Sequence, residues 1–342
     1  MLFKLITTET DWDNLADKWS RLLPAALSHV PFLEFDYLRT WWQTRGGGEY
    51  RPEDSHLRLV IATRDDLLVG IAPLFSTKTA LGQSVLMFIG SIEVSDYLDL
   101  VVRPEDAAEF TQGLVQFLAS DPRTKGHLVS LYNIPASSPT TDTLKTFSEN
   151  QGISFHQETL QPCPHVSLPP DWEGYLSNLD KKQRHEIRRK IRRAEESPNI
   201  VDWYMVHEAS NVRTEMQAFI EMMAKDPQKD QFLTPNMRKF LLDLAPVLHQ
   251  NGWLNLSFLT VDGQKAAAYL CIHYDNQLWV YNSAWDQAFA EFSPGWVLLG
   301  YLVQWAIEQG IQAVDFMRGD EVYKYRFGGR DRQINLAQFV LS

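Results

Sequence analysis

Short apolar runs separated by polar turns occur in two stretches of the chain. The first stretch covers residues 57–90 and the second covers residues 254–286. Each holds three strand-like segments, and polar residues such as Asp262-Gly263 lie between them. Asp-Gly between alternating apolar runs is a strong signal for a tight hairpin turn. The pattern therefore predicts three successive strands in each stretch.

A helix and a further strand are predicted after each stretch. In the first half, an apolar-periodic segment at 104–121 precedes the strand-like segment 127–134. In the second half, the segment 293–310 precedes the segment 312–317. The order β-β-β-α-β in both halves, with a parallel crossover at its end, indicates one mixed α/β unit present twice. We therefore predict an α/β protein with mixed α+β sheets.

The two units are predicted to join near residues 161–172. Four prolines in this window prevent a continuous helix and favour an extended connector. We accordingly predict two tandem domains, at residues 1–160 and 161–342. Helices are predicted to precede the strands in both halves, at residues 11–23, 35–44, 175–196, 209–223 and 235–250.

Length and composition narrow the class of protein. A chain of 342 residues suits two domains, and 44% hydrophobic residues suit a globular core. The net charge of −11 means that nucleic acid or an anionic membrane surface would need a local basic patch. No apolar run approaches the roughly 20 residues of a membrane span, and the N-terminus lacks the pattern of a signal peptide. We therefore expect a cytoplasmic protein.

The two cysteines, Cys163 and Cys271, do not form a metal-ligand spacing. We expect reduced thiols, with a disulfide as the alternative, and no metal site. The sequence also lacks a Walker A pattern, a GxGxxG after a strand, an HExxH and a GxSxG. Residues that could catalyse a reaction or bind a ligand therefore have to be sought in stretches without a specific motif.

A strongly basic segment is predicted to form a helix at residues 179–197. Its apolar residues fall close to one stripe, so the helix can dock by that side and present its basic side chains on the other. One interpretation is a solvated helix face with internal ion pairs. The other is a landing surface for a polyanion, namely tRNA, a nucleotide or an anionic lipid headgroup. The basic side chains run from Lys181 to Arg193.

Ser293-Pro294-Gly295 is predicted to open an apolar helix. Serine suits the N-cap and proline suits the first helical position. A helix N-terminus presents N–H groups and partial positive charge, which favour phosphate, although an ordinary capped helix is the alternative. The matching helix of the first half opens with Glu105, Asp106 and Glu109, whose carboxylates would repel phosphate. An anionic cofactor is therefore favoured in the second half.

The segment 315–329, DFMRGDEVYKYRFGG, combines a strand end, a charged turn and an aromatic-basic tail. It is either a core turn or the wall of a site, since ligands of α/β folds bind beyond the C-terminal ends of strands. On the second interpretation, Lys324, Tyr323 or Arg318 reaches a cofactor or an acyl carbonyl. Phe316 and Phe327 are expected in the core.

Four ordered stretches of the second half resemble the CelD-like acetyltransferases of the GNAT superfamily. They are YLSNLDKKQRHEIRRKIRRAEE, DGQKAAAYLCIHYDNQLWVYNSAWD, SPGWVLLGYLVQWAIEQG and DFMRGDEVYKYRFGG. This family is related to the Fem-type peptidyltransferases, which use a tandem pair of GNAT-like domains. The resemblance implies two tandem GNAT-like domains in a Fem-type architecture, of which the first is degenerate.

The resemblance also implies a sheet that splays where a pantetheine arm inserts. The pyrophosphate of acetyl-CoA or another acyl-CoA would then lie on the loop and helix N-terminus after the fourth strand. The residues that map there are Phe292, Ser293, Pro294, Gly295 and Trp296. Glu291, next to them, departs from the basic or glycine-rich character that is usual in this loop.

GNAT-type transfer to an amine needs a base and a donor for the developing oxyanion. We expect Asp286 to act as base or to position the amine, with a loop-capping role as the alternative. Lys324 is expected to contact phosphate or the oxyanion, and Tyr323 to be the acid for the leaving group. The other expected site residues are Tyr281, Asn282 and Ser283 along the cleft, and Arg318 and Glu321 at a polar acceptor.

The leading hypothesis is an acyl-CoA-dependent N-acyltransferase that acts on a small-molecule or sugar-linked amine. A Fem-like aminoacyl transfer from charged tRNA is the second hypothesis, which the basic helix favours. The third is a non-catalytic binding protein in an envelope or polysaccharide pathway.

Overall fold

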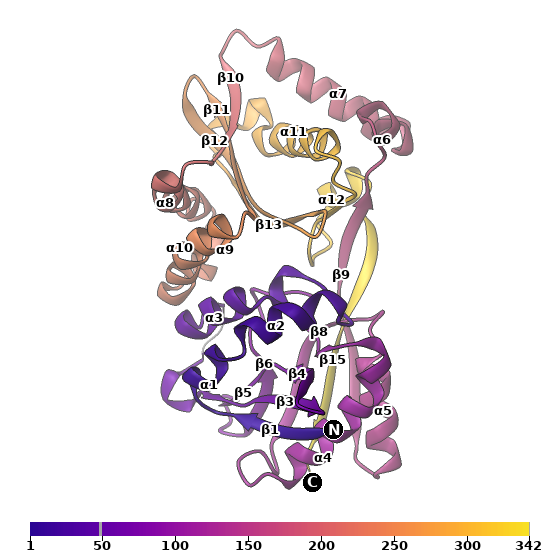
Figure 1. Ribbon diagram of the computed structural model, residues 1–342. Coiled ribbons are helices and arrows are strands. Elements are labelled where there is room, and N and C mark those ends of the chain that lie inside the picture. The colour runs from indigo at the N-terminus through magenta and orange to yellow at the C-terminus, as the bar shows by residue number, and fades with distance from the viewer. Residues whose placement is uncertain (48–49, 342) are drawn as a thin grey trace. The chain divides into compact units, whose positions relative to one another are not determined.

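The computed structural model describes residues 1–47 and 50–341 of the chain. It divides into two compact units, each visible in Figure 1. Unit 1 is Met1–Gln161 together with the last strand from Arg332 onward, and unit 2 is Pro162–Asp331. The chain passes into unit 2 within β9 (Phe155–Ser167) and returns within β15 (Arg330–Val340).

The predicted second domain extended to residue 342, whereas the last strand groups with unit 1. The physical reason is strand pairing, because β15 pairs antiparallel with β8, for example Phe339 with Val129. The segment 161–172, predicted to be an extended connector, is extended and forms the second half of β9 as far as Ser167.

Unit 1 contains a four-stranded sheet in the order β1-β3-β4-β7 and a second set in the order β15-β8-β6-β5-β2. Its other strands are β1 (Leu2–Ile6), β2 (His56–Leu57), β3 (Leu59–Arg64), β4 (Leu67–Ala72), β5 (Leu74–Lys78), β6 (Ser84–Phe88), β7 (Val101–Val102) and β8 (Leu128–Pro135). Its α-helices are α1 (Glu9–Asp13), α2 (Ala16–Leu22), α3 (Phe35–Thr44), α4 (Ala107–Ser120) and α5 (Thr140–Asn150). The helix predicted at residues 11–23 is thus two helices, interrupted at Asn14 and Leu15.

Unit 2 has one sheet in the order β10-β11-β12-β13-β14-β9. Its strands are β10 (Val201–Met205), β11 (Leu254–Val261), β12 (Gln264–Tyr274), β13 (Gln277–Trp285) and β14 (Ala313–Asp315), with the end of β9. Its α-helices are α6 (Trp172–Asn178), α7 (Lys181–Glu195), α8 (Val212–Met223), α9 (Pro227–Phe232), α10 (Pro235–Gln250), α11 (Pro294–Glu308) and α12 (Val322–Arg326). The order β11-β12-β13-α11-β14 is the predicted β-β-β-α-β unit.

The predicted hairpin turn at Asp262-Gly263 is confirmed. Asp262 has a φ of 50° and Gly263 a φ of 77°, as a two-residue turn of the I′ type requires. The turn between β12 and β13 is built in the same way, with φ values of 47° and 57° at Asp275 and Asn276. These turns place β11, β12 and β13 next to one another, antiparallel throughout.

The helices α7 and α11 pack together on one side of this sheet (Figure 1). The buried side of α11 includes Val297 and Leu302, which belong to the same core cluster as the sheet residues. The basic helix α7 docks through its apolar stripe, since Ile187 and Ala194 are buried. The helix predicted at residues 175–196 is broken after α6, because Asp180 caps α7 and its side chain accepts from the Gln183 N–H at 2.9 Å.

The segment after β14 is held by a buried lysine. Lys324 is 2% exposed, and its ammonium donates to the carbonyls of Met317 at 3.1 Å, Arg318 at 2.6 Å and Gly319 at 3.3 Å. It also pairs with the Glu321 carboxylate at 2.8 Å. Gly319 in this turn has a φ of 109°, a conformation that residues with a side chain rarely adopt, so the turn favours glycine. The lysine therefore fixes α12 against the loop that precedes it.

We predict that Lys324→Met lowers the free energy of unfolding by about 3 kcal/mol, because three carbonyls lose their buried donor. Urea denaturation followed by circular dichroism measures the change. Lys181→Met is the control, since Lys181 is exposed and the change should stay within about 0.5 kcal/mol. Equal stability of the two variants would contradict the structural role of Lys324.

Candidate active site

β14 accompanies β13 only at its beginning. The parallel pairing joins Gln277–Trp279 of β13 to Ala313–Asp315 of β14, and β13 then continues as far as Trp285. Beyond Trp279 the strand therefore has β12 on one edge and no β14 on the other. The pairing between these two strands therefore ends at Trp279.

The register shows which peptide groups point into this opening. The Asp286 N–H donates to the Ala266 carbonyl at 2.9 Å, and hydrogen-bonded pairs alternate along an antiparallel ladder. Ser283 precedes Asp286 by three residues and lies opposite Tyr269 of β12. By this alternation, Ser283 and Tyr269 form a pair that does not exchange backbone hydrogen bonds. The N–H and C=O of Ser283 consequently point away from β12, toward the open edge.

A β-bulge lies next to this position. Leu270 pairs with Asn282 while Cys271 pairs with Val280, so Tyr281 is the extra residue of β13. Bulges bend a strand and re-aim side chains, and they are common beside active sites. Tyr281, predicted to line a cleft, is half-buried here.

Two side chains satisfy the outward peptide groups of Ser283. Its N–H donates to the Asn282 side-chain oxygen at 2.8 Å. Its carbonyl accepts from the ammonium of Lys229 on α9, which also lies 3.5 Å from the Asn282 oxygen. Burial lowers the pKa of Lys229, and the nearby carboxylates of Asp226 and Glu321 oppose this shift. Lys229 was not predicted as a site residue.

Two tyrosines, the buried Tyr269 and the half-buried Tyr323, complete this part of the site. Burial raises the pKa of Tyr269, whose hydroxyl is hydrogen-bonded to the Ser283 side chain. Burial also raises the pKa of Tyr323 on α12, and the neighbouring Glu321 carboxylate adds to the shift. Both phenols therefore keep their protons at neutral pH.

Asp286 is engaged in contacts that organise the loop after β13. Its carboxylate pairs with Lys225 and accepts from the Ala288 N–H at 2.9 Å. The hydrogen bond from Lys225 is the main reason that the pKa of Asp286 lies below its usual value. The carboxylate is thus a weak base, and its contacts are those of the loop-capping alternative.

The N-terminus of α11 lies beside the end of β13. Ser293 is the N-cap and Pro294 the first helical residue, as predicted, but Ser293 is left-handed, with a φ of 52°, and its hydroxyl does not cap a backbone N–H. The N–H groups of Trp296 and Val297 both donate to the Ser293 carbonyl. Pro294 has no N–H, so within the described chain the Gly295 N–H is the one donor of the first turn that has no hydrogen-bond partner.

The space over Gly295 is nearly open. A Cβ atom there would meet only Trp285 of β13, at 3.9 Å. The backbone is therefore accessible to a ligand at this point, on the positive end of the helix dipole.

Basic side chains from α7 gather around this helix end. Arg193 donates to the Glu291 carbonyl and to the Ser293 hydroxyl at 3.3 Å. The Lys190 ammonium lies 4.0 Å from the centre of the Trp296 ring. The Trp296 Nε1 is buried and has no hydrogen-bond partner among the described residues. The loop thus obtains from α7 the positive charge that its own sequence lacks.

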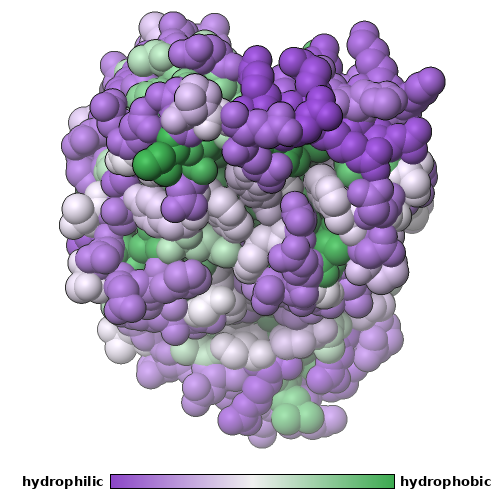
Figure 2. Space-filling view, turned by 90° about the horizontal axis from the view of Figure 1, so that it is seen from above, coloured by the Kyte–Doolittle hydropathy of each residue, from purple (hydrophilic) through white to green (hydrophobic). Residues whose placement is uncertain are grey.

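The other basic side chains of α7 fall into two groups. Arg188, Arg189 and Arg192 lie within ion-pair distance of glutamates. Lys181, Lys182 and Arg184, in the first turns, have no ion pair within the described chain, and they lie where the helix dipole disfavours cations. Figure 2 shows strongly hydrophilic side chains gathered in one corner of the face seen from above, on the side where α7 lies in Figure 1.

The structure thus brings together part of the predicted site. Asn282 and Ser283 contact Lys229, and the Ser283 side chain is hydrogen-bonded to Tyr269. Glu321 lies near enough to raise the pKa of Lys229, and Tyr323 near enough to raise that of Tyr269. Lys324 is enclosed by loop carbonyls, and Arg318 gives one of those carbonyls and is half-buried. Phe292 packs against the core of unit 2. Sequence reasoning missed Lys229 and Tyr269, which carry no motif, and it did not connect Lys190 and Arg193 with the Ser293 loop.

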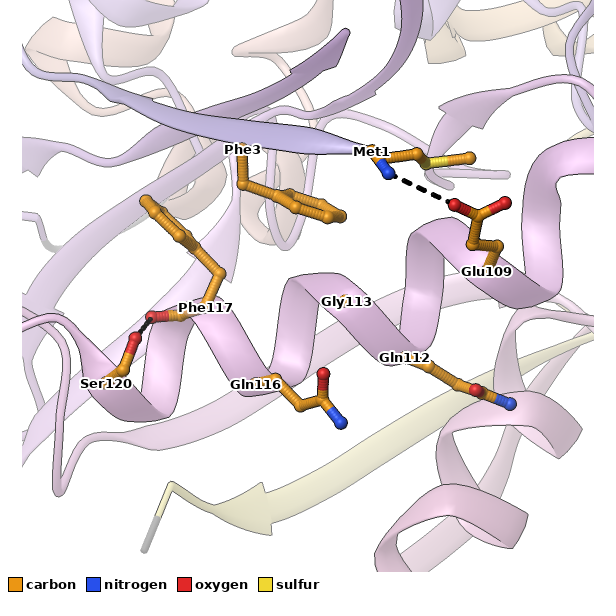
Figure 3. A pocket seen from close by; sticks show the side chains of 8 residues that line it. All are labelled: Met1, Phe3, Glu109, Gln112, Gly113, Gln116, Phe117 and Ser120. Carbon is orange, nitrogen blue, oxygen red and sulfur yellow. Dashed lines mark hydrogen bonds and ion pairs between the residues drawn. The ribbon is translucent and has the colours of Figure 1, made fainter. Parts of the chain in front are cut away.

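A hollow of about 450 Å³ lies in unit 1 between β1 and α4 (Figure 3). Phe3 and Phe117 form its apolar wall, and Gln112 and Gln116 lie along α4. The N-terminal ammonium of Met1 is paired with the Glu109 carboxylate at 3.2 Å. The polar groups that line this hollow include the side-chain amides of Gln112 and Gln116 and the ion pair between Met1 and Glu109.

Two kinds of feature are absent from residues 1–47 and 50–341. No helix has both the length and the apolar composition needed to cross a bilayer. No three His, Cys, Asp or Glu side chains lie together as metal ligands would.

Comparison with known proteins gives the class of the second half. Residues 181–325 match the family model described as an acetyltransferase (GNAT) domain. No curated protein sequence matches the chain.

Solved structures show the fold. FemX is 12% identical with a TM-score of 0.64, covering 98% of this chain and 97% of that chain. A conserved protein of unknown function from Bacteroides thetaiotaomicron is 13% identical with a TM-score of 0.59, covering 99% of both chains. L-PGS from Bacillus licheniformis is 13% identical with a TM-score of 0.52, covering 88% of this chain and 90% of that chain. The CelD-like subtype stays a prediction.

The α/β chain thus has the fold of two GNAT-like units and carries a GNAT acetyltransferase domain at residues 181–325.

Proposed function

We propose that this protein is an N-acyltransferase that transfers an acyl group from acetyl-CoA or another acyl-CoA to an amine. One observation carries the proposal, namely that the open edge of β13 ends beside a helix N-terminus that Arg193 contacts. The Gly295 N–H, the helix dipole and the guanidinium of Arg193 suit a pyrophosphate. The orphaned Nε1 of Trp296 offers a further donor.

The open edge of β13 suits the donor's extended amide chain. An extended ligand can pair with the outward N–H and C=O of Ser283 as an added strand would. The side chains of Asn282 and Lys229 occupy these groups here, so they would turn aside when the donor binds. Tyr281, at the bulge, lies directly before them in the strand.

The reaction is a direct attack of the amine nitrogen on the thioester carbonyl carbon. The C–N bond forms, the C–S bond breaks, and the amine loses a proton while the thiolate gains one. Glu321 pairs with Lys324 through its Oε2 oxygen and its side chain is 59% exposed, so its other carboxylate oxygen would position the amine and accept its proton. Tyr323 and Tyr269 keep their protons and would donate hydrogen bonds to developing negative charge.

Unit 1 is proposed to hold no donor. Glu109 and Asp106, at the start of α4, are both paired with Arg64 at 2.7 Å. The helix end that would correspond to the phosphate site is therefore filled with carboxylates and their counterion. A structural role for unit 1 is consistent with this arrangement.

A substitution at Gly295 tests the phosphate site. Gly295→Asp should weaken acetyl-CoA binding at least about tenfold more than Gly295→Asn, because the two side chains have the same size and differ in charge. Calorimetric titration of each purified variant measures the two affinities. Equal affinities would place the phosphates elsewhere, and no binding of any acyl-CoA to the unchanged protein would refute the proposal.

A second prediction separates the two candidate carboxylates. Glu321→Gln should slow acyl transfer by about 100-fold, the usual loss when a general base is removed. Asp286→Asn should cost less than about tenfold, because it loosens the cap of the loop after β13. Single-turnover rates with saturating acetyl-CoA provide the comparison, and the reverse order would return the base to Asp286.

Aminoacyl-tRNA is the second candidate donor, which the resemblance to Fem-type enzymes implies. The favouring observation is that Lys181, Lys182 and Arg184 have no anionic partner in the described chain. Cations without partners, at a helix end that disfavours them, are suited to bind phosphates.

If tRNA is the donor, reversing Lys181, Lys182 and Arg184 to Glu should weaken filter binding of charged tRNA by about 100-fold. The affinity of the unchanged protein should also fall linearly with salt on a logarithmic scale. Acetyl-CoA binding of the same variant is the control, because Arg193 is intact. Unaltered tRNA binding removes this candidate, and a protein that binds neither donor would be a non-catalytic binding protein.

A further inference from the structure

Lys229 is a half-buried cation whose direct contacts are neutral. Its ammonium reaches the Ser283 carbonyl and the Asn282 side-chain oxygen. No carboxylate lies within ion-pair distance of it among the described residues. Burial lowers the pKa of the ammonium, which reflects the cost of removing this charge from water.

The two carboxylates that act on the Lys229 ammonium are already engaged. Asp226 caps α9, where its side chain accepts from the Gln228 N–H at 2.9 Å. Glu321 pairs with Lys324 at 2.8 Å. Both raise the pKa of Lys229 by less than burial lowers it. A charge in such surroundings is stabilised strongly by an anionic ligand, because buried ions need a counterion.

We propose that Lys229 binds a carboxylate of the acceptor, so that the acceptor is an amine that carries a carboxylate, such as an amino acid or a peptide end. The inference rests on the proposed acyl transfer and names the acceptor class. Glu321 attracts the amine and Lys229 attracts the carboxylate. The two groups lie within electrostatic reach of each other, as the opposite charges of one zwitterion require.

Carboxylate binding would also prepare the donor site. The ammonium exchanges its contact with the Ser283 carbonyl for the acceptor's carboxylate, and the carbonyl becomes available to the donor's amide chain. Each ligand should therefore strengthen binding of the other, because coupling between two sites is reciprocal.

The test compares a carboxylate with a neutral ligand of the same shape. N-acetylglycine and N-acetylglycinamide are titrated calorimetrically into the full chain, first alone and then with CoA present. We expect the unchanged protein to bind the carboxylate at least about tenfold more tightly, a difference of about 1.4 kcal/mol. The preference should fall as pH rises through the lowered pKa of Lys229, where the ammonium loses its proton.

Lys229→Gln is the informative variant, because glutamine can still donate to the Ser283 carbonyl but has no charge. It should abolish the preference, while Lys229→Arg should keep most of it. Lys239→Gln, on the exposed side of α10, is the matched control and should behave as the unchanged protein. Thermal denaturation of each variant establishes that it is folded.

Equal or undetectable binding of the two probes to the unchanged protein would overturn the inference, as would a preference that survives Lys229→Gln. Failure of the proposed function has a different signature, since it would be seen as absent binding of every acyl-CoA. If acyl-CoA binds and simple amines are acylated without regard to a carboxylate, only the inference about Lys229 fails.

Discussion

The early departure of β14 from β13 is the constraint on which the rest of the candidate site depends. Once the parallel pairing stops at Trp279, the next residues of β13 have peptide groups that a neighbouring strand does not satisfy. Unpaired backbone groups are costly when they are removed from water, so they must find side chains, water or a ligand. Asn282 and Lys229 meet that need here. An edge that is satisfied only by side chains can accept a ligand by exchange.

The positive charge beside the N-terminus of α11 comes from α7, which precedes it by about a hundred residues in the chain. The protein is acidic overall, and the loop before α11 contains Glu291. The docked position of α7 changes that local balance, because its stripe at Ile187 and Ala194 is buried and Ile191 packs on Gly300. Arg193 and Lys190 then face the start of α11. Apolar packing on one side of the helix is thus what delivers cations from the other.

The polar side chains in and just before α12 have two kinds of role: one stabilises the loop after β14, and the others are candidates for a part in the reaction. Lys324 is enclosed by three carbonyls, so its charge stabilises the loop after β14. That loop carries Glu321, which remains largely exposed while paired with the same lysine. Tyr323, in the same short helix, is half-buried and lies near Tyr269. The short helix α12 and its N-cap residue therefore hold a structural cation, an accessible carboxylate and a protonated phenol.

The sequence by itself determined many of the local elements, although the stretch 57–90 holds β3, β4, β5 and β6 where three strands were predicted. Asp262-Gly263 adopts the left-handed turn that its residue types favour, α3 and α10 span the predicted residues, and α11 starts at Pro294. These features depend on neighbours within a few positions, so short-range rules suffice for them. The four stretches that resemble GNAT enzymes likewise indicated the tandem fold.

Only the tertiary structure decided which side chains meet. Periodicity in α7 gave its apolar side, but it could not show that Arg193 would reach Ser293. Lys229 lies in a polar segment without a motif, and its meaning comes from a strand edge that opens far away in the sequence. The return of β15 to unit 1 was equally hidden. Contacts between distant segments depend on how whole helices and strands pack against one another. The pattern of residues within one segment does not indicate which other segment it will contact.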